Sequence, residues 1–187
     1  MISIWSRIRI ITFIFVNIVG VCFLNDQFHL ANSKDVTCED NIHAVMGKYY
    51  RGYKIITLES LEDDLKEYFK QNFANENPGC VSADFDGDGT IDYAVLLLRE
   101  EQKMATEKVI VLKGQQNGKF IPINLYTIHE RIHDFFLQKI TPGKIKEEDS
   151  DYSVIIKNPA FALNLFESAS RVYYWDGKKF RNIQTSD

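Results

Sequence analysis

The sequence is poor in cysteine, with three residues in 187, and it has no excess of basic side chains. Its 22 lysines and arginines are interspersed among 26 aspartates and glutamates, so there is no basic patch of the kind that binds nucleic acid. No run of glycines is present that could cradle a phosphate, and no Cys-x-x-Cys pair that could hold zinc. A hydrophobic content of 45% with a net charge of -4 excludes a disordered acidic chain and indicates one globular domain.

The apolar segment at residues 10–24 is shorter than the ~20 residues that a membrane-spanning helix needs. Arg7 and Arg9 precede it, and the small residues Ala-Asn-Ser, ending at Ser33, follow it. A positive start, an apolar centre and a small-residue end are typical of a secretory signal. We therefore predict that residues 1–33 are a cleaved signal peptide, with an uncleaved membrane anchor as the main alternative.

The remaining chain, residues 34–187, is predicted to be one domain that keeps Cys38 and Cys80. In an exported protein these two could form one disulfide across a loop of roughly 40 residues, adding ~3–4 kcal/mol of stability. Two buried thiols are the alternative, because the sequence does not fix the distance between the two Cα atoms. Cys22 lies in a Val-Gly-Val-Cys stretch that partly matches a lipoprotein cleavage box, which is a further alternative for the N-terminus.

Helical patterns come first in the domain, and strand patterns follow. Apolar residues recur every three or four positions in residues 57–73 and 126–137, and more weakly in residues 39–50, which predicts helices. Residues 141–151 read as an exposed loop. The predicted strands and hairpins are residues 80–84, 93–99, 108–125 with a turn at Asn117-Gly118, 152–157, 161–167, and 170–184 with a turn at Asp176-Gly177. This order predicts an α+β fold, with N-terminal helices followed by a mainly antiparallel sheet of hairpins.

An acidic loop lies between the first two predicted strands. Its carboxylates are Asp84, Asp86, Asp88 and Asp92. Gly89 allows a sharp bend, so the carbonyl of Thr90 can also turn inward. Oxygen donors at this spacing suit Ca²⁺, which takes six to eight oxygens, and the loop has no His or Cys to favour zinc. It is not an EF-hand, because Val95 stands where that loop needs a bidentate glutamate.

Residues 84–96, Asp-Phe-Asp-Gly-Asp-Gly-Thr-Ile-Asp-Tyr-Ala-Val-Leu, resemble the calcium loop of FG-GAP and VCBS-type repeats. The resemblance implies a strand–loop–strand unit in a small exported bacterial protein. It also implies a calcium ligand set of four side chains and one carbonyl, from Asp84, Asp86, Asp88, Asp92 and Thr90. The chain has one copy of the motif, whereas those repeats build a propeller from several copies.

A second motif, His-Glu-Arg-Ile-His, fits the H-E-x-x-H pattern of zinc hydrolases. On a helix, His129 and His133 would lie one turn apart and could share a Zn²⁺, with Glu130 as general base. Arg131 and Asp134 place charges where such helices have uncharged residues. We keep a zinc-dependent hydrolase as the alternative function and a solvent-facing helix as the simpler interpretation.

The sequence therefore predicts a calcium-binding, non-enzymatic structural or binding module that is periplasmic or secreted. Its partner would be an unidentified protein or another component of the cell envelope, recognised through the aromatic strand at residues 173–175. No contact with nucleic acid is expected, nor with the membrane once the signal is cleaved.

Overall fold

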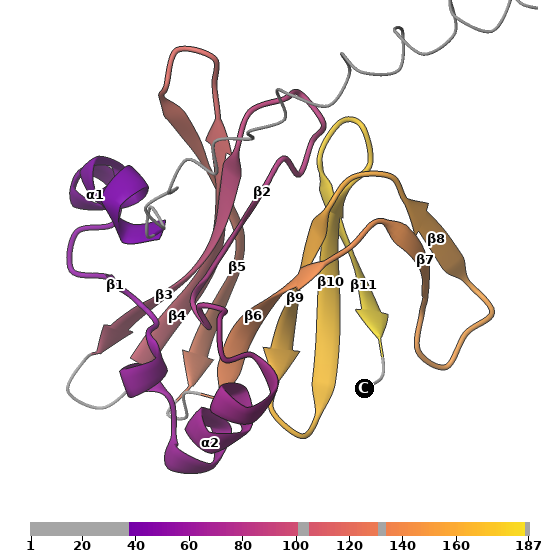
Figure 1. Ribbon diagram of the computed structural model, residues 1–187, viewed down its shortest axis with the longest axis horizontal. Helices are drawn as coiled ribbons and strands as arrows, with labels where there is room; N and C mark the ends of the chain where they lie inside the picture. Colours follow the sequence, from indigo (N-terminus) through magenta and orange to yellow (C-terminus); the bar gives the residue numbers. More distant parts are fainter. Residues whose placement is uncertain (1–37, 101–104, 131–133, 186–187) are drawn as a thin grey trace, which may run out of the picture. The chain divides into compact units, whose positions relative to one another are not determined.

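The computed structural model describes residues 38–100, 105–130 and 134–185, and leaves the side chains of residues 39–41 and 130 undescribed. The predicted signal segment, residues 1–33, lies outside the described residues. Among the described residues, none of the helices has the length and apolar character that crossing a bilayer requires. The described chain forms two antiparallel sheets and one separate hairpin (Figure 1).

The first sheet, called sheet A here, has the strand order β1-β3-β4-β5, with β2 also pairing with β3. Its strands are β1 (Lys54–Ile55), β2 (Cys80–Ala83), β3 (Asp92–Glu100), β4 (Ala105–Gly114) and β5 (Phe120–Glu130). The second sheet, sheet B, has the order β11-β10-β9-β6. Its strands are β6 (Phe135–Ile140), β9 (Ala160–Leu165), β10 (Ala169–Trp175) and β11 (Phe180–Thr185). The separate hairpin pairs β7 (Gly143–Lys146) with β8 (Ser153–Ile156). The helices are α1 (Cys38–Tyr49), the 3-10 turn η1 (Leu58–Ser60) and α2 (Asp63–Asn72).

Both hairpins predicted from turn residues are present. β4 pairs with β5 across a turn that contains Gly118, and β10 pairs with β11 across a turn that contains Gly177. These glycines have φ of 73° and 94°, the left-handed conformation that glycine adopts at little cost. The weak helix predicted at residues 39–50 corresponds to α1.

The α+β prediction is wrong, because strands hold 50% of the described residues and helices 16%. The predicted helix at residues 126–137 is instead the end of β5 and the start of β6. Ile128 is buried and both of its neighbours are exposed, which is the alternation expected of a strand. The apolar run at residues 135–137 is too short to distinguish a helix from a strand. The expected loop at residues 141–151 also contains β7.

The helix predicted at residues 57–73 is interrupted. Leu61 has extended backbone angles, with φ of -77° and ψ of 150°, so η1 ends there and α2 begins at Asp63. Leu65 and Phe69 on α2 are buried, whereas its first turn is exposed. This turn carries acidic side chains, which the helix dipole favours at the N-terminus of a helix.

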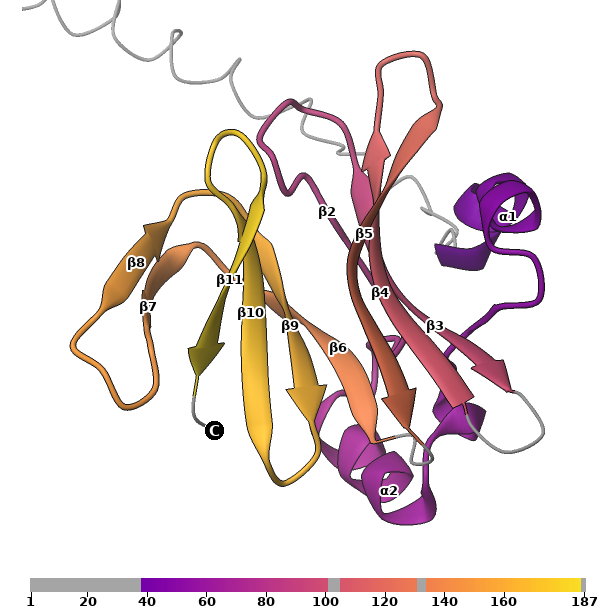
Figure 2. The same cartoon turned by 180° about the vertical axis from the view of Figure 1, so that it is seen from behind.

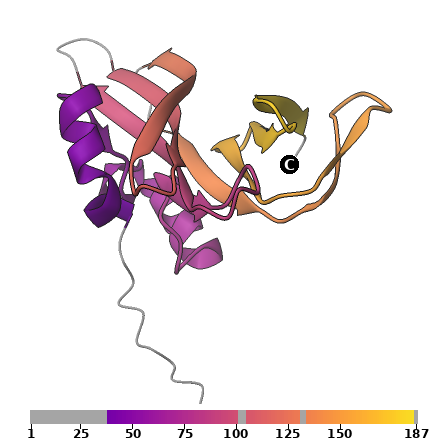
Figure 3. The ribbon, with the colours of Figure 1, turned by 90° about the horizontal axis from the view of Figure 1, so that it is seen from above.

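The main core lies where the inner faces of both sheets and α2 meet. Leu96 and Val109 from sheet A pack there with Phe161 from sheet B and Phe69 from α2. A second core, which includes Ile42, lies between α1 and the opposite face of sheet A. Figure 2 and Figure 3 show α1 and sheet B on opposite sides of sheet A. Strand β3 is consequently buried along most of its length on both faces.

Cys38 and Cys80 form a disulfide with their Cα atoms 6.4 Å apart. This distance lies within the range of about 4.4–6.8 Å that disulfides span. The bond joins the start of α1 to the start of β2, and it decides between the two alternatives left open by the sequence. It therefore fixes one end of α1 against sheet A.

Candidate metal centre

The acidic loop connects β2 to β3, which pair directly with each other so that Ala83 lies opposite Asp92. Three of its side chains come together. Asp84, Asp86 and Asp88 each offer a carboxylate oxygen, and these oxygens lie within 4.8 Å of one another. An acidic cluster of this kind could hold a metal ion.

Backbone amides of the loop hold these carboxylates in place. Asp84 accepts hydrogen bonds from the N–H groups of Gly87, Asp88 and Gly89 at 2.7, 3.1 and 2.8 Å. Asp88 accepts one from the Thr90 N–H at 2.9 Å, and hydrogen bonding to Thr90 is the main reason that the pKa of Asp88 is lowered. A carboxylate oxygen has two lone pairs. Asp84 Oδ1 uses both on the N–H groups of Gly87 and Asp88, whereas Asp84 Oδ2 and Asp88 Oδ1 each accept one bond and keep a lone pair for a cation.

Two glycines allow the tight course of the loop. Gly87 and Gly89 have φ of 77° and 84°. A Cβ at Gly89 would meet nothing within 4 Å, whereas one at Gly87 would lie 2.8 Å from the side-chain amide nitrogen of Asn158. That amide donates a hydrogen bond to the Phe85 carbonyl at 3.3 Å. Asn158 lies between β8 and β9, so the loop also contacts the part of the chain that leads into sheet B.

A lysine from β4 reaches into the acidic cluster. The Nζ of Lys113 contacts Asp86 Oδ2 directly and lies 3.6 Å from Asp88 Oδ2. The hydrogen bond to Asp86 is the largest cause of the raised pKa of Lys113. The same ammonium lies 5.5 Å from the ring centroid of Trp175 on β10. One positive charge therefore faces three carboxylates, which leaves the cluster with an excess of negative charge.

Asp92 has a different environment from the other three aspartates. It is fully buried, and its two oxygens accept hydrogen bonds from the N–H groups of Phe85 at 2.9 Å and Gly114 at 2.8 Å. Desolvation is the main cause that raises its pKa to about 6. A Cβ at Gly114 would collide with the Ile91 carbonyl, so a glycine is needed for β4 to approach the loop this closely. Asp92 thus links both ends of the loop to β4.

The structure brings three of the five predicted ligands into one cluster. Thr90 lies in the same loop, and Asp92 is the first residue of β3. The ligand roles of all five residues remain predictions. Sequence reasoning missed Lys113 and Asn158. Lys113 comes close to the acidic loop because Tyr93 of β3 pairs with Leu112 of β4. This pairing joins distant parts of the sequence, so the sequence around Lys113 gives no sign of it beyond the glycine that follows.

The zinc-hydrolase alternative requires a helix at His129, and the structure has a strand there. His129 lies in β5, where its Nδ1 is 3.3 Å from Thr106 Oγ1 across the β4–β5 ladder. His133 and the side chain of Glu130 lie outside the described residues. The aromatic strand at residues 173–175 also contributes to the core, since Tyr173 is buried and stacks on Phe161 with ring centroids 5.3 Å apart.

Comparison of the chain with protein-family models, with curated proteins and with solved structures found no match. The described residues form a mainly β protein with a disulfide and an acidic hairpin loop that could hold a metal ion.

Proposed function

We propose that this protein is an exported calcium-binding module, in which the ion stabilises the β2–β3 loop and takes no part in catalysis. The observation that carries the proposal is the cluster of Asp84, Asp86 and Asp88, whose oxygens lie within 4.8 Å of one another. Carboxylate oxygens are the donors that Ca²⁺ prefers, and the flexible coordination of Ca²⁺ tolerates a set drawn from one short loop better than Mg²⁺ does.

Lys113 supports a cationic ligand, because its ammonium group already occupies part of the cluster. One monovalent group leaves the three carboxylates incompletely neutralised. A divalent cation would neutralise them better, and it would compete with Lys113 for Asp86.

The side chains of Asp84, Asp86 and Asp88 would hold the ion, together with Asp92 and the Thr90 carbonyl as the further predicted ligands. The ion supplies positive charge that removes repulsion among the carboxylates. The same loop accepts a hydrogen bond from Asn158 through the Phe85 carbonyl. Ordering the loop would therefore stabilise its contact with the segment that leads into sheet B as well as the turn itself.

Export is supported by the Cys38–Cys80 disulfide, since stable disulfides are typical of oxidising compartments outside the cytoplasm. A periplasmic or secreted location would also supply calcium in the range of about 10⁻⁴–10⁻³ M that extracellular calcium modules require. We propose that the protein acts there on an unidentified protein or envelope partner.

Thermal unfolding with and without a chelator tests the calcium proposal. At a free Ca²⁺ concentration ten times the Kd, binding adds roughly 1.4 kcal/mol of stability, which raises the Tm by about 3–6 °C. EDTA should remove this increase in the wild type. An unchanged Tm after addition of both EDTA and then excess Ca²⁺ would contradict the proposal.

Two variants show whether the effect belongs to the acidic loop. Asp88→Ala removes one clustered carboxylate and should abolish the response of the Tm to Ca²⁺. Asp151→Ala removes the same charge from an exposed position beyond the loop and should keep the full response. Equal responses in the two variants would place the calcium effect elsewhere on the protein.

A further inference from the structure

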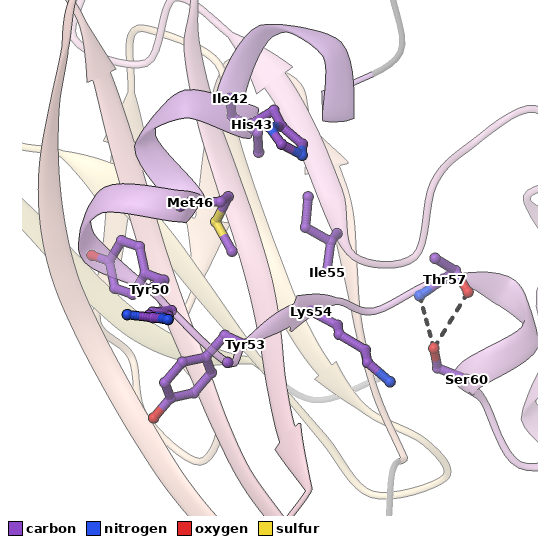
Figure 4. A pocket seen from close by; sticks show the side chains of 12 residues that line it. Ile42, His43, Met46, Tyr50, Tyr53, Lys54, Ile55, Thr57 and Ser60 are labelled. Carbon is purple, nitrogen blue, oxygen red and sulfur yellow. Dashed lines mark hydrogen bonds between the residues drawn. The ribbon is translucent and has the colours of Figure 1, made fainter.

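A pocket of about 520 Å³ lies on the face of sheet A that α1 covers. Figure 4 shows its lining residues, which come from α1, from the segment that follows it, from β1, and from Thr57 and Ser60 at the two ends of η1. The volume falls within the range of about 300–1,000 Å³ that is usual for small-molecule sites. The pocket is separate from the acidic loop, with which it shares no lining residue.

One wall of the pocket is apolar and held in place. Its apolar and aromatic side chains come from Ile42, Met46, Tyr50, Tyr53 and Ile55. The Tyr50 hydroxyl donates a hydrogen bond to Asn124 Oδ1 on β5 at 3.1 Å, which fixes that ring against the sheet. The disulfide fixes the start of α1. An apolar wall on rigid elements suits a ligand with an aliphatic or aromatic part.

The polar part of the lining is entirely basic or neutral. His43, Arg51 and Lys54 line the pocket, and none of the 12 lining residues is acidic. This differs from the whole chain, in which acidic side chains outnumber lysine and arginine by 26 to 22. The ring of Tyr53 also has Arg99 at 5.0 Å and Lys108 at 5.2 Å from its centroid. The described charged side chains that line this pocket or contact Tyr53 are therefore all basic, and the acidic neighbour is Glu59, which hydrogen-bonds to the lining residue Thr57.

We propose that this pocket binds an organic carboxylate with an aliphatic part. The carboxylate would pair with Arg51 and Lys54, and the aliphatic part would lie against Met46 on α1 and Ile55 on β1, which are both partly exposed. The proposal does not depend on calcium binding, because the pocket and the acidic loop use different residues.

Calorimetric titration of the full-length protein with three probes separates the two parts of the recognition. Octanoate carries both the anionic group and the chain, octylammonium carries the same chain with the opposite charge, and acetate carries the anion alone. Octanoate should bind saturably with a stoichiometry of one, and at least about tenfold more tightly than either of the others. Absence of saturable octanoate binding, or equal binding of octylammonium, would overturn the proposal.

Charge variants place the carboxylate in the pocket. The double variant Arg51→Gln/Lys54→Gln should weaken octanoate binding by about tenfold through loss of two charged partners. The control Lys144→Gln/Lys146→Gln makes the same change of charge at exposed positions on β7 and should leave the affinity unchanged. A similar loss in both double variants would show a general charge effect and would overturn the assignment to this pocket.

Gly47 offers a steric test. It lines the pocket, and a Cβ added there would meet nothing within 4 Å. Gly47→Leu should fill the space and abolish octanoate binding, while the Tm does not fall, because leucine is a better helix former than glycine. Gly47→Ala, a smaller addition, should keep most of the binding. Undiminished octanoate binding by folded Gly47→Leu protein would overturn the proposal.

Discussion

Replacement of Lys113 by methionine should make the protein bind Ca²⁺ more tightly and make the calcium-free protein less stable. The Lys113 ammonium contacts Asp86, whose side chain is only 5% exposed. Ca²⁺ must displace this ammonium to use the same carboxylate. Methionine keeps an unbranched apolar side chain at this position and removes only the competing charge.

The expected change in the Kd for Ca²⁺ follows from how exposed the Lys113–Asp86 pair is. The Lys113 side chain is 27% exposed, so its contact with Asp86 is partly screened and contributes about 1 kcal/mol. Repulsion between a dication and an ammonium group that stays nearby adds a similar amount. Together these terms amount to about 2 kcal/mol, which corresponds to a Kd for Ca²⁺ that is about 30-fold lower in Lys113→Met than in the wild type.

Isothermal titration of EDTA-stripped protein with CaCl₂ measures this change. Lys113→Arg, which keeps the charge, should have an affinity close to that of the wild type. Lys119→Met, which removes a charge from the exposed β4–β5 hairpin, should change the Kd little. An unchanged or higher Kd in folded Lys113→Met protein would refute the idea that Lys113 competes with the cation.

Three further results are expected. Cys38→Ser/Cys80→Ser should lower the free energy of unfolding by about 4 kcal/mol, measured by urea denaturation, because the disulfide spans 42 residues; a loss below about 1 kcal/mol would count against this bond as a major constraint. In EDTA, the free energy of unfolding should fall by an amount on the order of 3 kcal/mol as the pH rises from about 4 to about 6. In this range folded Asp92, with its pKa raised to about 6, still holds a proton that the unfolded chain has released. If Asp92→Asn does not show this fall, the effect belongs to Asp92. Gly87→Ala should destabilise the protein more than Gly89→Ala does, because both residues have positive φ, at a cost of about 1–2 kcal/mol, and only Gly87 faces Asn158; equal losses of Tm would contradict this packing.

Local signals predicted the hairpins well. Asn117-Gly118 and Asp176-Gly177 are turns whose conformation depends mainly on the two residues themselves, so no distant contact is needed to recognise them. The acidic loop could be located for the same reason, because its carboxylates and glycines are all close in sequence.

Features that depend on distant pairing could not be predicted. The segment around His129 has apolar residues at helical spacing, but its pairing with β4 makes it a strand. The contact of Lys113 with Asp86 depends on the register between β3 and β4, and the approach of Asn158 depends on how the two sheets pack. Likewise, the sequence allowed a disulfide between Cys38 and Cys80, but only the position of α1 against β2 brings the two residues together.

Measurement of the stoichiometry of Ca²⁺ binding tests the central claim most directly. Purified protein is stripped with EDTA, dialysed, and titrated calorimetrically with CaCl₂ up to about 10 mM, beyond the usual affinity range of extracellular calcium modules. We predict one saturable Ca²⁺ per chain in the wild type and none in Asp88→Ala. Absence of saturable binding in the wild type, or full binding in Asp88→Ala, would contradict the assignment of the acidic loop as a calcium site.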